Sequence, residues 1–154
     1  MLDKDACELL DADHLAVKHL FVEYARLAMA AAQESAGERA ALAQRICAEL
    51  TVHAQIEEEI FYPALRGAVP DAGPLLDEAE AEHQEAKDLI AQIEAIGDAA
   101  DPAMDDLVSR LAQAIEHHVK EERTQLFPKA RSAPGLDLGA LGDQLRERQQ
   151  AVQA

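Results

Sequence analysis

Apolar residues recur along the chain at the spacing of one helix face. The clearest examples are two stripes with apolar side chains four positions apart, Leu42, Ile46 and Leu50 and, later, Leu107, Leu111 and Ile115. Glycine, proline and serine interrupt these patterns at 35–37, 67–74, 97–102 and 132–135. The pattern predicts four long helices near residues 5–33, 38–66, 74–96 and 102–131, and it leaves room for a short fifth helix at 137–151.

The fold expected from these segments is an all-α bundle. Short connections between long helices favour antiparallel neighbours, so the helices should run up, down, up and down. A chain of 154 residues with 3% aromatic residues and no Trp also favours helices over a β-sandwich. We expect residues 1–135 to form a four-helix bundle and residues 136–154 to form a C-terminal helical tail.

The charge of the chain argues against some classes of partner, and its cysteine content indicates the compartment. The chain has 30 acidic and 14 basic side chains and a formal net charge of −16, which would repel a nucleic-acid backbone or an anionic membrane. Cys7 and Cys47 form no C-x-x-C motif and no disulfide-rich pattern, so reduced thiols are expected. Since no apolar leader or membrane span is found, the sequence predicts a soluble cytoplasmic protein.

The sequence repeats itself across its two halves. At an offset of 69 residues, Asp13-His14 with Lys18 returns as Glu82-His83 with Lys87. At an offset of 65 residues, His53-x-x-x-Glu57 followed by Tyr62-Pro63 returns as His118-x-x-x-Glu122 followed by Phe127-Pro128. Two helical hairpins related by a pseudo-two-fold axis would explain both correspondences.

The repeated histidines and glutamates have the arrangement of a metal site. A histidine and a glutamate four residues apart share one helix face. Each half places its first histidine about nine residues, or roughly 14 Å, into a helix, and its second histidine ten residues before a proline. All should therefore lie at one level of the bundle. The six candidate ligands are His14, His53, Glu57, His83, His118 and Glu122.

Mixed imidazole and carboxylate ligands suit a dinuclear iron centre. We expect two histidines on each iron and bridging carboxylates from Glu57 and Glu122. One coordination position would then remain for oxygen, peroxide or another small ligand, and reactivity would arise there.

The same residues resemble a known family. The order and spacing of Asp13-His14, His53-x-x-x-Glu57, Tyr62-Pro63, Glu82-His83 and His118-x-x-x-Glu122 are similar to those of the bacterial hemerythrin (HHE cation-binding) domains over nearly the whole chain. The resemblance implies a left-handed four-helix bundle and a non-haem diiron centre with carboxylate bridges and an oxo or hydroxo bridge. It also implies chemistry with oxygen, peroxide or nitric oxide, and it assigns the role of metal ligand to the same six residues.

The chain departs from the oxygen-carrying hemerythrins at two positions. Lys87 stands where they have a second histidine on the third helix, and Glu122 follows His118 by four residues where they have an aspartate after five. These departures argue against reversible oxygen storage with five histidines. A fifth imidazole could come from His19 or His117, neither of which has a counterpart in the other half.

Some roles stay open on the sequence alone. The carboxylates that compete with the two candidate glutamates are Glu58 and Glu121. Lys18 and Lys87 either hydrogen-bond a ligand carboxylate or lie on the surface. Tyr24 and Tyr62 are interpreted as packing residues.

Two other metal sites fit less well. A ferritin-like diiron site would use Glu80-x-x-His83 and Asp11-x-x-His14, but it would leave His53 and His118 unused. A zinc site is disfavoured because zinc usually takes four ligands and six are offered.

Two functions from different classes follow from a diiron site. The first is redox chemistry with a small oxidant, such as catalase-like peroxide removal or nitric-oxide handling in oxidative or nitrosative stress. The alternative is a non-catalytic module that stores or senses oxygen or iron. Both expect a small-molecule ligand and neither requires a nucleic acid or a membrane.

Overall fold

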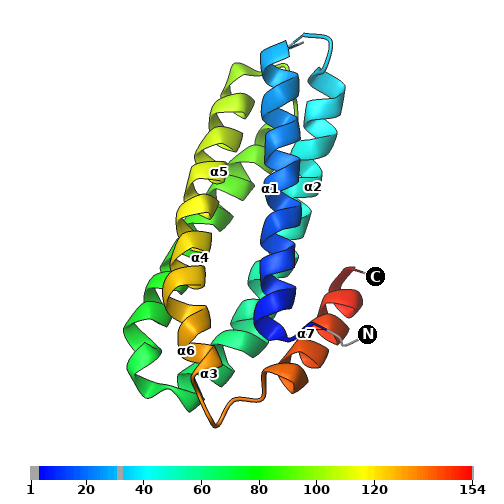
Figure 1. Cartoon of the computed structure of the whole chain (residues 1–154). Helices are drawn as coiled ribbons and strands as arrows, with labels where there is room; N and C mark the ends of the chain where they lie inside the picture. Colours follow the sequence, from blue (N-terminus) through cyan, green and yellow to red (C-terminus); the bar gives the residue numbers. More distant parts are fainter. Residues whose placement is uncertain (1–3, 31–32, 154) are drawn as a thin grey trace.

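Four long helical rods run antiparallel to one another in the computed structural model, which describes residues 4–30 and 33–153. The first rod is α1 (Ala6–Ala30), and the second joins α2 (Ala36–Ile56), η1 (Glu57–Phe61) and α3 (Tyr62–Ala68). After a 3-10 turn, η2 (Pro70–Ala72), the third rod is α4 (Gly73–Ile96). The fourth joins α5 (Pro102–Glu121), η3 (Glu122–Leu126) and α6 (Phe127–Arg131), and the up-down-up-down order is visible in Figure 1.

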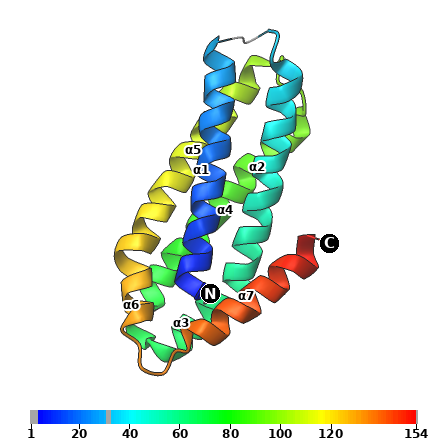
Figure 2. The ribbon, with the colours of Figure 1, turned by 45° about the vertical axis from the view of Figure 1, so that its right-hand side comes forward.

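A further helix, α7 (Leu138–Gln153), lies across one end of the bundle. Figure 2 shows it running past the start of α1 and the end of the second rod. The all-α prediction is confirmed, and the predicted segments match the observed rods to within a few residues. The predicted end of the first helix at residue 33 falls across residues 31–32, which lie outside the described residues.

The second and fourth rods each contain one π-helical turn, at Glu57–Phe61 and at Glu122–Leu126. A proline inside an α-helix has no N–H to donate, and its ring clashes with the carbonyl four residues earlier. In the wider turn the N–H of Tyr62 donates to the carbonyl of Glu57, and that of Phe127 to the carbonyl of Glu122. The rods therefore continue past Pro63 and Pro128 for another turn.

Two apolar clusters fill the bundle on either side of a polar layer. The cluster nearer the α1–α2 connection includes Val17, Ile46, Leu50 and Leu111. The cluster nearer α7 contains most of the largest fully buried side chains, which here are Tyr62, Phe61, Phe127, Leu10, Ile56, Leu65, Leu76 and Leu145. Each such side chain contributes roughly 1.5–3 kcal/mol when it leaves water. In the predicted stripes, Leu42 and Ile115 are only half-buried.

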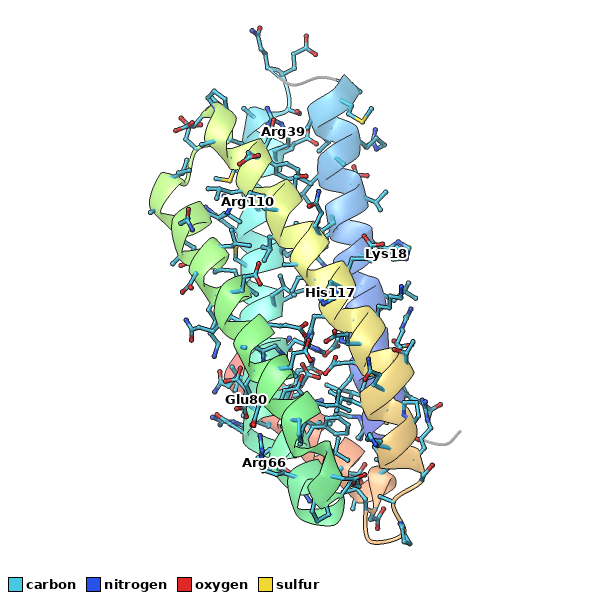
Figure 3. The ribbon with its side chains drawn as sticks, turned by 90° about the vertical axis from the view of Figure 1, so that its left-hand side faces the viewer. Lys18, Arg39, Arg66, Glu80, Arg110 and His117 are labelled. Carbon is cyan, nitrogen blue, oxygen red and sulfur yellow. The ribbon has the colours of Figure 1, made fainter. Side chains whose placement is uncertain are left out.

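An ion pair between a buried arginine and a partly exposed aspartate lies at the end of the bundle far from α7. The guanidinium of Arg39 is 2% exposed and donates from Nη1 to Asp105 Oδ1 at 2.6 Å. The hydroxyl of Tyr24 donates to the same carboxylate oxygen at 2.6 Å. This contact ties α1, α2 and α5 together, and Figure 3 labels Arg39 at that end.

Both cysteines are free and buried, as expected for reduced thiols. Burial raises the pKa of the Cys7 thiol to about 12 and that of Cys47 to about 11. Among the described residues, no helix has the length and apolar content needed to cross a membrane.

The crossing of α7 over the start of α1 depends on Gly142. A Cβ at this position would lie 2.7 Å from the carbonyl oxygen of Lys4 and 2.9 Å from the carbonyl carbon of Asp5. Because backbone atoms cannot rotate away, we predict that Gly142→Ala lowers the free energy of unfolding by about 1–3 kcal/mol in urea titrations.

Gly37→Ala is the matched control for this substitution. A Cβ on Gly37 meets no atom within 4 Å, so alanine there should leave stability unchanged or raise it by about 0.4–1 kcal/mol. Equal stabilities for the two variants would show that α7 does not pack closely on α1.

Candidate metal centre

The polar layer between the apolar clusters consists of the six residues singled out in the sequence. His14 comes from α1, His53 from α2, His83 from α4 and His118 from α5, while Glu57 and Glu122 open the two π turns. All six are buried, with exposures from 0% to 7%. The structure thus brings together every sequence-predicted candidate at one level of the bundle.

The four imidazoles form two pairs that meet through their Nε2 atoms. His14 Nε2 and His53 Nε2 are 3.0 Å apart, and their rings meet edge to face. His83 Nε2 and His118 Nε2 are 3.2 Å apart in the same arrangement. One pair therefore belongs to each sequence half, as the internal repeat predicts.

Each glutamate lies between a histidine of one half and a histidine of the other. Glu57 Oε1 is 3.1 Å from His53 Nε2 and 3.2 Å from His83 Nε2. Glu122 Oε1 is 3.0 Å from His14 Nε2 and 3.6 Å from His118 Nε2. Either carboxylate can therefore serve both histidine pairs.

Some of these buried ligand atoms are left without a hydrogen-bond partner. Among the described residues, both carboxylate oxygens of Glu57 and Oε1 of Glu122 accept no hydrogen bond. A buried carboxylate without a donor is costly. The histidine and glutamate atoms instead cluster in two groups whose ligand atoms lie within 4.8 Å of one another, one with His14, His53, Glu57 and Glu122 and one with Glu57, His83 and His118. This donor set fits metal cations.

The electrostatics of the layer also favour added positive charge. Burial opposes protonation of His53, but the carboxylates of Glu57 and Asp13 outweigh it and raise the pKa of His53 to about 10. Burial also opposes protonation of His118, but the carboxylate of Glu122 outweighs this effect and raises the pKa of His118 to about 12. Burial opposes ionisation of Glu57, yet the charge of His53 holds the pKa of this carboxyl well below its usual range.

Three histidines are oriented from behind by carboxylates. The Nδ1 of His53 donates to Asp13 Oδ2 at 3.1 Å, that of His83 to Glu58 Oε2 at 2.7 Å, and that of His118 to Glu82 Oε1 at 2.7 Å. Such contacts fix the tautomer and aim Nε2 at the centre. The sequence reasoning missed these roles, although the acidic residue before each of His14 and His83 recurs in the repeat.

Tyr62 breaks the symmetry of the layer on one side. Its hydroxyl donates to Glu122 Oε2 at 2.6 Å and lies 3.3 Å from the Nε2 atoms of both His83 and His118. Burial, together with Glu57 and Glu122, raises the pKa of Tyr62 well above its usual value. At the equivalent position Phe127 stacks on His14 with ring centres 6.1 Å apart. The interpretation of Tyr62 as a packing residue missed its polar contacts.

The two other candidate histidines, His19 and His117, lie on the surface of the bundle. His117 has a side chain 64% exposed, and it contacts Glu82 and Glu121 on the outer face of α5, where Figure 3 labels it. His19 is also exposed. Neither adds an imidazole to the layer.

Lys87 and Glu58 form a pair outside the layer. Lys87 Nζ donates to Glu58 Oε1 at 2.9 Å, so it supports the carboxylate behind His83 rather than a buried glutamate. Glu80, required by a ferritin-like site, has a side chain 49% exposed and lies 3.8 Å from Arg66. The ferritin-like set is therefore not assembled.

A small cavity lies beside the histidine layer, on the side of the apolar cluster that contains Val17. It measures about 30 Å³ and is lined by all four buried histidines together with Leu50 and Ile115. This volume is large enough for one water-sized molecule.

Comparison with known proteins decides the family. Residues 5–130 match the family model described as the hemerythrin HHE cation binding domain. The chain belongs to the hemerythrin HHE cation-binding family. Within this family, a solved structure of an HHE cation-binding domain-containing protein from Mycobacterium kansasii is similar, with 25% identity and a TM-score of 0.77. The similarity covers 97% of this chain and 88% of that one.

A curated relative of this hemerythrin domain is a DNA nickase from Nostoc sp. The two are 38% identical over 90 residues, which make up 57% of this chain. The match covers only 24% of the nickase.

The C-terminal helix reaches the histidine layer of this hemerythrin domain through one contact. Gln149 Nε2 on α7 donates at 2.9 Å to Asp13 Oδ2, the atom that accepts from His53. We predict that Gln149→Glu, which places a carboxylate against Asp13, lowers the free energy of unfolding by about 1–2 kcal/mol. Gln150→Glu makes the same charge change at an exposed neighbour and should change little. If both variants unfold at the same denaturant concentration, the contact does not stabilise α7 on the bundle.

Proposed function

We propose that this hemerythrin domain binds two iron ions in the histidine layer and uses them to react with a small oxidant. The observation that carries the proposal is the set of buried carboxylate oxygens without hydrogen-bond donors, surrounded by four imidazole Nε2 atoms. Imidazole and carboxylate together suit iron. Membership of a cation-binding family supports a metal at this place.

His14 and His53 would hold one ion, and His83 and His118 the other. Glu57 and Glu122 would serve both, since each lies beside a histidine of either pair. When bound, the iron pair supplies redox chemistry at a position open to a small ligand.

The remaining residues of the layer orient ligands and hold protons. Asp13, Glu58 and Glu82 keep three histidines in one tautomer, with Nε2 facing inward. The hydroxyl of Tyr62 keeps its proton and donates it in a hydrogen bond to the buried Glu122 Oε2. The cavity of about 30 Å³ suits oxygen, peroxide or nitric oxide and is too small for a bulky substrate.

Peroxide removal is the favoured reaction. Two molecules of hydrogen peroxide give two of water and one of oxygen, so the balance needs no external electron donor. The protein would then act against oxidative or nitrosative stress in the cytoplasm. The alternative is a non-catalytic module that stores or senses oxygen or iron; the two-carboxylate, four-histidine layer would serve it equally.

We do not extend DNA nicking to this chain. The match covers 24% of the nickase, and a net charge of −16 opposes contact with a phosphate backbone.

Metal content tests the ligand assignment. The purified chain should contain about two iron ions, and Glu57→Gln or Glu122→Gln should lose most of this iron because each removes a buried carboxylate that would hold the metals. The control is Glu59→Gln, which changes the same run of glutamates at a side chain 40% exposed. Iron content measured by plasma mass spectrometry that is equal in all four proteins would remove both glutamates from the ligand set.

Peroxide decomposition tests the activity. The iron-loaded protein should show a charge-transfer absorption band and consume peroxide, and His118→Ala should slow consumption by at least about tenfold. His117→Ala removes the adjacent but exposed imidazole and should leave the rate unchanged. Equal rates for the wild type and His118→Ala, with reversible oxygen binding by the wild type, would favour storage over catalysis.

A further inference from the structure

A wide groove runs between α1 and α5. Its volume is about 550 Å³, and it extends from His14 along Phe21, Val22 and Ala25 on α1 and along Ile115 and Ala112 on α5. We refer to it as the α1/α5 groove. Volumes of roughly 300–1,000 Å³ are typical of sites for small organic ligands. Figure 3 looks onto this side of the bundle, with Lys18 labelled on α1 next to α5.

The matching seam of the other sequence half is closed. The cavity at the four histidines, which reaches this seam through α2 and α4 residues such as Thr51 and Lys87, measures only about 30 Å³. At the offsets of the repeat, Lys18 of the groove corresponds to Lys87 and Arg123 corresponds to Glu58. On the closed seam Lys87 and Glu58 form a salt bridge at 2.9 Å. Two cations at the equivalent places cannot pair with each other, so the α1/α5 groove has no such closure.

One end of the groove is apolar and exposed to solvent. Val22 lines this end and is 60% exposed, as one of three large apolar side chains found exposed among the described residues. Leu15, which is 51% exposed, lines the opposite end, next to His14. Phe21 and Ile115, which are half-buried, continue the apolar surface toward the core. The lining therefore offers an uncovered strip for a hydrocarbon chain.

The other end of the groove is cationic. Lys18, Lys120 and Arg123 line it, with Glu116 as the one acidic side chain in the lining. Arg123 is paired with Asp11. In the described part of the chain, neither Lys18 nor Lys120 forms an ion pair, although the chain has 30 acidic side chains for 14 basic ones. Two unpaired ammonium groups at one mouth favour an anionic ligand group.

The positions of the cations and of the apolar strip along α1 and α5 determine how a ligand would be oriented in the groove. Since α1 and α5 are antiparallel and His14 lies 3.0 Å from Glu122, the three cations fall within about one turn of the histidine layer. The apolar strip at Val22 and Ala25 begins about two turns from the layer, or about one turn beyond Lys18. The groove is thus charged near the metal centre and apolar away from it.

We propose that the α1/α5 groove binds a medium-chain fatty acid, with the carboxylate at Lys18 and Lys120 and the hydrocarbon chain along Phe21, Val22 and Ala25. Charge complementarity selects the carboxylate, and the exposed apolar strip selects the chain. The groove adjoins the cavity of about 30 Å³ at the histidines, with which it shares His14, Ile115 and Val119, but the proposed ligand would lie in the groove. The proposal therefore goes beyond the reaction with a small oxidant.

Calorimetric titration of the purified, metal-bearing protein with dodecanoate, kept below its micelle concentration, tests the proposal. We expect saturable binding of one molecule per chain. Lys18→Glu and Lys120→Glu should each raise Kd by at least about tenfold, because each substitution reverses a charge at the carboxylate. Lys129→Glu makes the same charge change at a site outside the groove and should leave Kd unchanged.

Two further probes separate charge from hydrophobic contact. Dodecanol, which has the chain without the charge, should bind at least about tenfold more weakly than dodecanoate, and Val22→Glu should weaken dodecanoate binding as well. The proposal is overturned if dodecanoate does not bind, if dodecanol binds equally well, or if the three lysine variants bind alike. Because the titration requires no turnover, these results are independent of whether the metal centre decomposes peroxide.

Discussion

Two buried carboxylates, of whose four oxygens three have no hydrogen-bond donor, are the constraint on which this molecule depends. Glu57 and Glu122 are fully buried, and removing a carboxylate from water costs several kcal/mol unless opposite charge replaces the lost solvation. Four imidazoles surround them, and two of these, His53 and His118, have pKa values raised to about 10 and about 12 by the same carboxylates. Metal cations would supply the positive charge that these carboxylates need. The outer carboxylates of Asp13, Glu58 and Glu82 hold three of the imidazoles in position around them.

The internal repeat builds the layer, and departures from the repeat make its two sides chemically different. One half supplies Tyr62 where the other supplies Phe127, so a hydroxyl reaches one pair of histidines and an apolar ring covers the other. Glu58 and Arg123 are a second such departure, because only the first can orient a histidine. It follows that the two metal positions would differ in polarity, and that the seam between α1 and α5 is open where the equivalent seam between α2 and α4 is closed by a salt bridge.

Much of this could be predicted from sequence because it depends on helical periodicity. Four segments of helical length, repeated histidines and their distance from a proline were enough to place the ligands at one level. What could not be predicted depends on side-chain reach across the bundle. The pairing of Asp13 with His53 joins residues 40 apart in sequence, and no spacing rule specifies which carboxylate lies behind which imidazole.

The docking of α7 and the width of the groove were beyond the sequence for a related reason. Helical periodicity predicts that residues 137–151 can be helical, but the crossing over α1 depends on the backbone approach at Gly142. The groove between α1 and α5 has two cations, Lys18 and Arg123, in its lining, where the equivalent residues of the other seam form a salt bridge. Their facing positions are known only once the helices are placed in space.

The π turns connect the prolines of the sequence to the chemistry of the layer. In an α-helix, residues five apart point about 140° away from each other, so Tyr62 would face away from the histidines if Glu57 faced toward them. In a turn closed by bonds to the fifth residue back, positions five apart lie nearly one above the other. The N–H of Tyr62 makes such a bond to Glu57, which puts the glutamate and the tyrosine on the same side of the rod. Pro63 favours the wider turn because it cannot complete a normal one. Pro63 thus helps to place a hydroxyl beside His83 and His118, and Pro128 helps to place Phe127 over His14 in the same way.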